Sequence, residues 1–293
     1  MKYRNVLIIV MSLIVLFAIA LCISQINEQF QDQNAQKPNL VIGFLTYPRD
    51  GVSTPQIFKR TYESLLKNKD TSDFGVIKII IIGDDYSNIE EQIRPIVKDS
   101  SFNVEILDIN KNNALRNMNV PKIHKWEHAC TRSIIKLFEI ANSYTDYDYL
   151  LISSDDDLYI NDTLKNIVPH INKYNHPDFL YARAYHADKT ILPRQTNEDP
   201  EKNVPKSGDT IESGTLYNLR NKSFMNDIIE FRKSRWQHVE SCIKTGVFNN
   251  IAPEDAELWD YLKPKFESRI YRSVLIPEIL VNHDTEQTIM KFI

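Results

Sequence analysis

Apolar runs and amphipathic stripes alternate along the chain from residue 39 onward. The run 76–82 (VIKIIII) is almost continuously β-branched and predicts a fully buried strand. Residues 126–144 repeat apolar positions at helical spacing. The patterns predict strands over 39–46, 76–82, 103–109, 147–152, 179–185, 215–219 and 276–281, and helices over 55–67, 89–98, 126–144, 223–232 and 253–262. This alternation predicts a single α/β domain over 39–293 with a mostly parallel central sheet.

The residues before this domain follow a different pattern. Residues 6–23 carry no charge, and as a helix they would span about 27 Å, near the thickness of a hydrocarbon core. Lys2 and Arg4 precede the run, so the positive-inside bias places residues 1–5 in the cytosol. The polar, Gln- and Asn-rich residues 24–38 predict a flexible stem.

We interpret residues 6–23 as an uncleaved transmembrane signal anchor; the alternative is a signal peptide cleaved at Ala18-x-Ala20. An anchor would make the chain a single-pass type II membrane protein, with its domain in the lumen of a Golgi- or ER-type compartment. Asn161 and Asn221 begin N-glycosylation sequons, which fit that location.

Composition excludes several kinds of site. The formal net charge is -4 and no basic cluster occurs, so nucleic acid is not an expected partner. The seven glycines form neither a G-x-G-x-x-G motif nor a Walker loop. Three scattered cysteines make no zinc site, and whether Cys130 and Cys242 pair is left open. A nucleotide ligand would therefore need a metal ion to neutralise its phosphates.

Three consecutive aspartates follow the predicted strand at 147–152. Clustered like charges repel one another, and a divalent cation with oxygen ligands offsets that repulsion. Asp155 and Asp157 are two residues apart, so on an extended chain they point the same way and would hold a metal. The alternative interpretation is a solvated acidic loop or a helix cap.

Two other predicted strands end in polar residues. Ligands of α/β sheets bind beyond the carboxyl ends of the strands. Thr46 and Arg49 after one strand, Asp84 and Asp85 after the next, and the three aspartates are therefore predicted to converge at one ligand-binding edge.

Four stretches carry a family resemblance: 58–62 (FKRTY), 147–161 (YDYLLISSDDDLYIN), 253–255 (PED) and 281–283 (VNH). They resemble the R-x-T-W, Y-D-Y-L-L-K-x-D-D-D-V-F-V-N and P-E-D-V elements and the late histidine of the β-1,3-galactosyltransferase and Fringe family. The family's V-G-x-C-L after E-D is replaced here by Ala-Glu-Leu-Trp-Asp. The resemblance implies a GT-A fold, that of the nucleotide-diphospho-sugar transferases.

The resemblance also implies a reaction. A sugar would move from a UDP-sugar to a hydroxyl of a glycan or glycoprotein, with Mn²⁺ or Mg²⁺ on the diphosphate. Asp155, Asp157 and His283 would bind the metal. Asp255 would be the general base of an inverting displacement, and its place at a helix N-terminus would keep it ionised.

The resemblance further implies contacts with the nucleotide. Asp156, or Asp155 itself, would also contact the ribose. Thr46 and Arg49 would line the nucleotide pocket, with Arg49 near the phosphates, and Asp84 and Asp85 would hydrogen-bond the nucleobase or ribose.

Other functions stay open at this point. The enzyme alternatives are a retaining glycosyltransferase and a nucleotidyltransferase that uses the same paired aspartates. The non-enzyme alternative is a membrane-anchored carbohydrate-binding protein on an inactive transferase fold.

Overall fold

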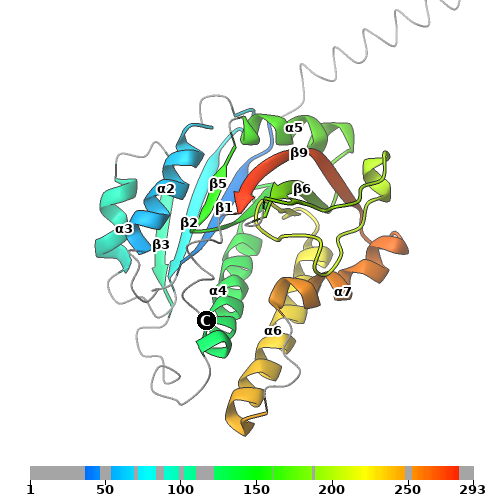
Figure 1. Cartoon of the computed structure of the whole chain (residues 1–293). Coiled ribbons are helices and arrows are strands. Elements are labelled where there is room, and N and C mark those ends of the chain that lie inside the picture. Colours follow the sequence, from blue (N-terminus) through cyan, green and yellow to red (C-terminus); the bar gives the residue numbers. More distant parts are fainter. Residues whose placement is uncertain are drawn as a thin grey trace, which may run out of the picture. The chain divides into compact units, whose positions relative to one another are not determined.

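The computed structural model describes residues 37–46, 54–68, 72–83, 89–98, 102–109, 122–160, 162–186, 189–247 and 253–283. The predicted cytosolic tail, membrane span and nearly all of the predicted stem lie outside them. None of the helices among the described residues is long and apolar enough to cross a bilayer. Residues 38–293 form one unit by their contacts, and Figure 1 shows its elements.

Parallel strands make up the first half of a nine-stranded sheet. The strand β1 (Leu40–Thr46) pairs in parallel with β2 (Ile77–Gly83) on one side and with β4 (Tyr149–Ser154) on the other. The edge strand β3 (Asn103–Asp108) pairs in parallel with β2. This half matches the predicted α/β pattern.

The second half of the sheet is mixed, which corrects the prediction of a mostly parallel sheet. The order is β3-β2-β1-β4-β8-β6-β9-β5, and β7 pairs with β6. The strand β8 runs antiparallel to β4 and β6, β5 antiparallel to β9, and β7 antiparallel to β6; β6 and β9 are parallel. Their bounds are β5 Asp157–Tyr159, β6 Phe179–Tyr185, β7 Ile191–Leu192, β8 Leu216–Asn218 and β9 Ser273–His283. The antiparallel partners β5, β7 and β8 are too short to show a strand period in the sequence.

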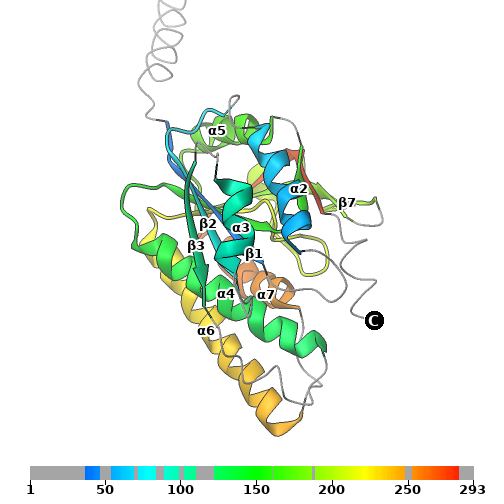
Figure 2. The same ribbon diagram turned by 90° about the vertical axis from the view of Figure 1, so that its left-hand side faces the viewer.

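Helices cover both faces of the sheet, as the two views show (Figures 1 and 2). One face packs on α2 (Thr54–Leu66), α3 (Ile89–Val97) and α5 (Thr163–Lys173). The other packs on α4 (Lys122–Ser143), α6 (Lys222–Thr245) and α7 (Glu254–Glu267). Alternate residues of β1 enter the two apolar clusters: Leu40, Ile42 and Phe44 enter one, and Val41 enters the other.

Most predicted elements are confirmed to within a few residues at their ends. The exceptions are α5, β5 and β7, which the pattern did not predict, and α6, which runs thirteen residues past its predicted end at Arg232, to Thr245. The apolar pattern did not predict this length because Arg232 and Arg235 occupy the buried face of α6, where a helix normally carries apolar residues. The predicted loop 192–208 contains a short 3-10 helix, Pro200–Lys202.

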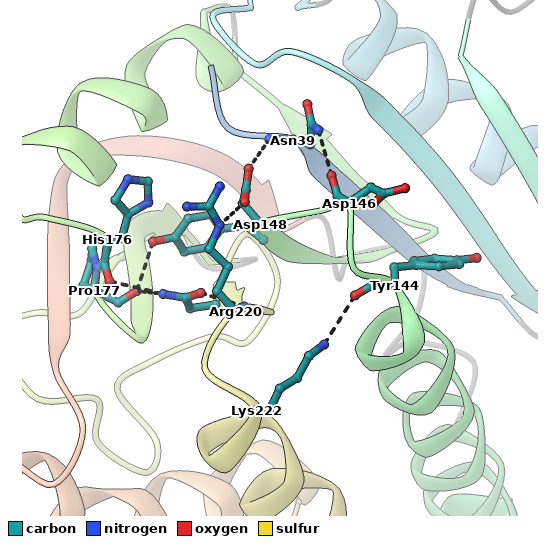
Figure 3. A network of polar contacts seen from close by, with 10 residues as sticks. Asn39, Tyr144, Asp146, Asp148, His176, Pro177, Arg220 and Lys222 are labelled. Carbon is teal, nitrogen blue, oxygen red and sulfur yellow. Dashed lines mark hydrogen bonds and ion pairs between the residues drawn. The ribbon is translucent and has the colours of Figure 1, made fainter. Parts of the chain in front are cut away.

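A polar network joins the amino ends of β1 and β4 to the start of α6 (Figure 3). The buried carboxylate of Asp148 accepts from the backbone N–H of Asn39 at 2.7 Å and pairs with Arg220. The ammonium of Lys222 donates to the carbonyl of Tyr144 at 3.3 Å, just beyond the end of α4. These bonds satisfy backbone groups that a strand start and a helix end leave unpaired.

Asn221, one of the two sequon asparagines, is the N-cap of α6. Its Oδ1 accepts from the N–H of Phe224 at 3.1 Å, and its Nδ2 donates to Asp178 at 2.7 Å. A glycan would be attached to the same Nδ2 that makes this second bond. The other sequon asparagine, Asn161, lies outside the described residues.

Helix α4 approaches β1 most closely at Gly43. A Cβ atom there would lie 2.3 Å from Cδ2 of Leu137 and 2.9 Å from its Cγ. We expect Gly43→Ala to lower the free energy of unfolding by about 1–3 kcal/mol through overpacking, as measured by urea denaturation. In a Leu137→Ala background the same change should cost much less, because the clashing atoms are gone. Equal costs in the two backgrounds would contradict this explanation.

Candidate functional site

The carboxyl ends of three parallel strands lie side by side. Thr46 at the end of β1 is opposite Gly83 at the end of β2, and the neighbouring Leu45 is opposite Ser154 at the end of β4. The predicted convergence of these strand ends is therefore confirmed. Three of the predicted nucleotide contacts, Arg49, Asp84 and Asp85, lie outside the described residues.

Asp155 is bonded on both its side chain and its backbone. Its Oδ2 accepts from the hydroxyl of Thr46 at 2.7 Å, and its carbonyl accepts from the hydroxyl of Thr61 on α2 at 2.8 Å. All three residues are buried. Asp155 thus joins β1 and α2 to the start of the acidic segment, and the Thr46 hydroxyl is directed at that carboxylate.

The three aspartates do not lie on one extended strand. Asp155 and Asp156 form a turn between β4 and β5, and Asp157 begins β5. The Oδ2 of Asp157 accepts from the N–H of Ser154 at 2.8 Å across that turn. Because of this turn, side chains do not alternate in direction from Asp155 to Asp157 as they would along a strand, which was the basis for pairing the two residues in the sequence interpretation. The exposed fractions of the three residues are 0%, 3% and 0%, so the acidic segment is no solvated loop.

His283 reaches Asp157 because the end of β9 lies between β6 and β5. The register of β9 against β6 shifts twice, once past the exposed Pro277 and Glu278 and once past Leu280. The last three residues of β9 also pair with β5 on its other side. Figure 1 shows β9 arching across the sheet towards β5. Its last residue, His283, then lies opposite Asp157, with Nδ1 of His283 2.7 Å from Oδ1 of Asp157.

Asp156, Asp157 and His283 form a group that is able to bind a metal ion. One donor atom from each lies within 4.8 Å of the others. Two buried carboxylates with one imidazole are oxygen-rich donors that suit Mn²⁺ or Mg²⁺. The group contains Asp156 where the sequence interpretation had Asp155.

The charges around His283 are negative. Burial by itself lowers the pKa of this histidine, but the hydrogen bond to Asp157 and the charges of Asp157, Asp156 and Asp255 outweigh it and raise the pKa to about 9. Without a metal, a protonated imidazole therefore offsets the buried carboxylates. A metal ion bound there would take over that role and displace the proton.

Asp255 lies in the first turn of α7, within electrostatic reach of His283. Burial and the neighbouring charge of Glu254 raise the pKa of Asp255; the N–H of Ala256, at 2.8 Å, and the charge of His283 act against them. A helix N-terminus alone would lower this pKa, so the direction differs from the sequence expectation. A raised pKa makes a carboxylate a better proton acceptor near neutral pH.

Two supporting residues were given no role from the sequence. Thr61 lies on α2, in the stretch 58–62 that carries part of the family resemblance, but nothing in its spacing indicated a contact with Asp155. Arg232, on α6, is fully buried and pairs with Glu254, the residue before Asp255. The available sequence signal for Arg232 was its position among the apolar residues of the buried face of α6.

No family model and no curated protein matches the sequence. Solved structures similar to it include the 4-diphosphocytidyl-2C-methyl-D-erythritol synthase of Anaerococcus prevotii DSM 20548, with a TM-score of 0.40, 10% identity, and 83% of this chain and 89% of that chain covered. Another is a candidate nucleotide-diphospho-sugar transferase of Desulfovibrio desulfuricans G20, with a TM-score of 0.42, 10% identity, and 83% and 81% covered.

These similarities are too low to carry an argument about fold or function. The functional argument therefore rests on the residues of the site. The resemblance to the β-1,3-galactosyltransferase and Fringe family stays a prediction.

The ion pair between His283 and Asp157 predicts a pH-dependent stability. The pKa of His283 is raised from 6.5 to about 9, so its stabilisation is complete below about pH 6.5 and is lost as the pH rises through about 9. In EDTA, His283→Gln should lower the free energy of unfolding by roughly 3 kcal/mol at about pH 6 and by much less at about pH 10. Urea denaturation at the two pH values measures the difference, and an equal loss at both would argue against the ion pair.

Proposed function

We propose that this chain is a metal-dependent glycosyltransferase of the GT-A type. It would move a sugar from a nucleotide-diphospho-sugar to a hydroxyl of a glycan or glycoprotein, with inversion of the anomeric carbon. The observation that carries the proposal is the group formed by Asp156, Asp157 and His283 at the carboxyl edge of the sheet, with the carboxylate of Asp255 within electrostatic reach. The family resemblance supplies UDP as the expected nucleotide.

The first part of the proposal concerns the donor. Asp156, Asp157 and His283 would hold Mn²⁺ or Mg²⁺, which stabilises the charge on a departing diphosphate. Asp155 would hold the acidic turn in place through Thr46 and Thr61, a role that its hydrogen bonds support.

The other donor contacts are predictions made from the sequence. Arg49, Asp84 and Asp85 stay predicted contacts of the nucleotide. They follow β1 and β2, and β1 ends between β2 and β4, which is compatible with one binding edge.

The second part concerns the acceptor. Asp255 would take the proton from the attacking hydroxyl. Its neighbour Glu254 is engaged by the buried guanidinium of Arg232, whereas the charge of Asp255 acts on His283. This difference favours Asp255 over Glu254 as the base.

The proposed location follows from the first residues of the chain. An anchor over 6–23 would tether the domain to a membrane and place it in a Golgi- or ER-type lumen, where glycan acceptors occur. The carbohydrate-binding and retaining alternatives are outcomes of the experiments below.

A panel of UDP- and GDP-sugars tests the donor proposal. With Mn²⁺ or Mg²⁺ present, at least one donor should be hydrolysed or transferred, and EDTA should stop the reaction. Asp157→Ala removes a proposed ligand and should reduce turnover by at least about 100-fold. Asp199, which caps the 3-10 helix and has a side chain that is 45% exposed, is the control, and Asp199→Ala should retain activity.

Three outcomes would contradict the donor proposal. Turnover that survives both EDTA and Asp157→Ala would remove the metal site. Pyrophosphate release from a nucleoside triphosphate and a sugar phosphate, with no sugar transfer, would favour a nucleotidyltransferase. Binding of glycans without turnover of any donor would favour the carbohydrate-binding alternative.

The role of Asp255 is tested by the rate and stereochemistry of transfer. Asp255→Asn removes the proton acceptor and should lower kcat by about 10²–10⁴-fold, with little change in Mn²⁺ affinity. Asp260→Asn, an exposed change on the same helix, is the matched control. NMR of the first-formed product should show the inverted anomer. A retained anomer, or an Asp255→Asn enzyme with wild-type kcat, would remove Asp255 as the inverting base.

A further inference from the structure

A fully buried arginine lies behind the candidate site. Arg232, on α6, has no exposed surface and bonds two carboxylates, Glu254 through Nη1 and Glu212 through Nη2. Its guanidinium also lies over the ring of Phe138, 4.6 Å from the ring centroid. Burying a charge is costly unless it is paired, and apolar residues of similar volume often serve stability equally well. The arginine therefore calls for an explanation beyond packing.

One of its two partners leads to the proposed base. Glu254 is the first residue of α7 and directly precedes Asp255. Because the bond to Arg232 fixes Glu254, it also fixes the start of the helix that carries Asp255. The N-cap position of α7 is Pro253, which makes no side-chain capping bond, so this turn has no cap of the usual kind.

The other partner leads to the acidic turn. Glu212 directly precedes Ser213, whose Oγ is 3.2 Å from the Oγ of Ser154 at the end of β4. The next residue, Gly214, donates its N–H to the carbonyl of Ile152 at 2.8 Å. Residues 212–214 therefore run directly beside the strand that leads into the three aspartates.

This segment is rigidly held. Glu212 accepts from the hydroxyl of Tyr217 at 2.6 Å. Gly214 has a φ of +82°, and a Cβ there would lie 2.8 Å from Val281 on β9, the strand that carries His283. A displacement of Glu212 would thus shift residues that contact both β4 and β9.

We infer that Arg232 is a positioning residue that sets the placement of Asp255 relative to the acidic turn. Its planar fork bonds two separate segments in fixed directions, one that runs beside β4 and one that carries Asp255. An apolar residue would fill the volume but fix neither segment. The inference rests on the proposed function, because it assigns Arg232 a role through Asp255.

Arg235 provides a matched comparison on the same helix face. It bonds Glu257 of α7 at 2.7 Å and Thr131 of α4 at 2.6 Å, and it is also buried. It therefore ties α6 to α7 as Arg232 does, but one turn further from Asp255. A lysine at either position keeps the charge and loses the fork.

The test compares Arg232→Lys with Arg235→Lys, using whichever donor the panel identifies. Arg232→Lys should lower kcat by about 10- to 100-fold, the effect of a misplaced catalytic group, with donor KM and Mn²⁺ affinity nearly unchanged. Arg235→Lys should keep kcat close to the wild-type value. Equal losses of kcat in the two variants would show a general packing effect and overturn the inference, as would an Arg232→Lys enzyme with wild-type kcat.

Hydrogen–deuterium exchange gives a readout that does not need turnover. Arg232→Lys should speed exchange in both 212–216 and 254–258, whereas Arg235→Lys should affect 254–258 alone. If the wild-type protein turns over no donor, the proposed function fails, and this exchange pattern still decides whether Arg232 couples the two segments. Unchanged exchange at 212–216 would show that it does not.

A charge-balanced variant covers the case in which Arg232→Lys does not fold. Arg232→Met with Glu212→Gln and Glu254→Gln removes the cation and both carboxylates, so no unpaired charge stays buried. This triple variant should fold and still lose kcat, because the directional bonds are gone. A folded triple variant with wild-type kcat would overturn the inference.

Discussion

The contact between Asp157 and His283 is the interaction on which the candidate site depends. The two residues are 126 positions apart and meet because the end of β9 lies between β6 and β5 and pairs with both. Buried carboxylates are unstable without compensation, and here the imidazole, a backbone N–H and a threonine hydroxyl provide it. The same contact brings the donor atoms of Asp156, Asp157 and His283 together, so the pairing that stabilises the fold also assembles the site.

The charges of this group and of the carboxylate of Asp255 influence one another. The pKa of His283 is raised partly by Asp255, and the pKa of Asp255 is raised by burial and by Glu254. The buried Arg232 pairs with Glu254 and with Glu212, which adds two more ion pairs in the interior. In the site, buried groups of opposite charge thus compensate one another. Each group influences the protonation or the position of its neighbour. Such an arrangement fits a reaction in which negative charge moves from an acceptor hydroxyl to a diphosphate.

The parallel half of the fold was predictable because its strands are long, apolar and separated by amphipathic helices. The antiparallel half was less so, since β5 and β8 have three residues each and their pairing is decided by distant partners. Helix α6 was predicted too short because its buried face carries two arginines. At the site, the triplet at 155–157, His283 and Asp255 were identified as candidates, but the turn that replaces an extended strand was not. Thr61 acts through a contact 94 positions away and Arg232 through contacts 20 and 22 positions away, all beyond the range of a local pattern.

The sequence by itself determined the alternation of elements, the acidic triplet at the end of a buried strand and the residues eligible for chemistry. These follow from local periodicity and residue type, which depend on neighbours along the chain. Tertiary structure alone decided that Asp156 rather than Asp155 joins Asp157 and His283, because a turn reverses the direction in which each carboxylate points. It also decided that the pKa of Asp255 is raised, because burial and the charge of Glu254 outweigh the opposing bonds and charge. Side-chain direction and desolvation are set by what packs against a residue, and in this chain the decisive partners lie about a hundred positions apart.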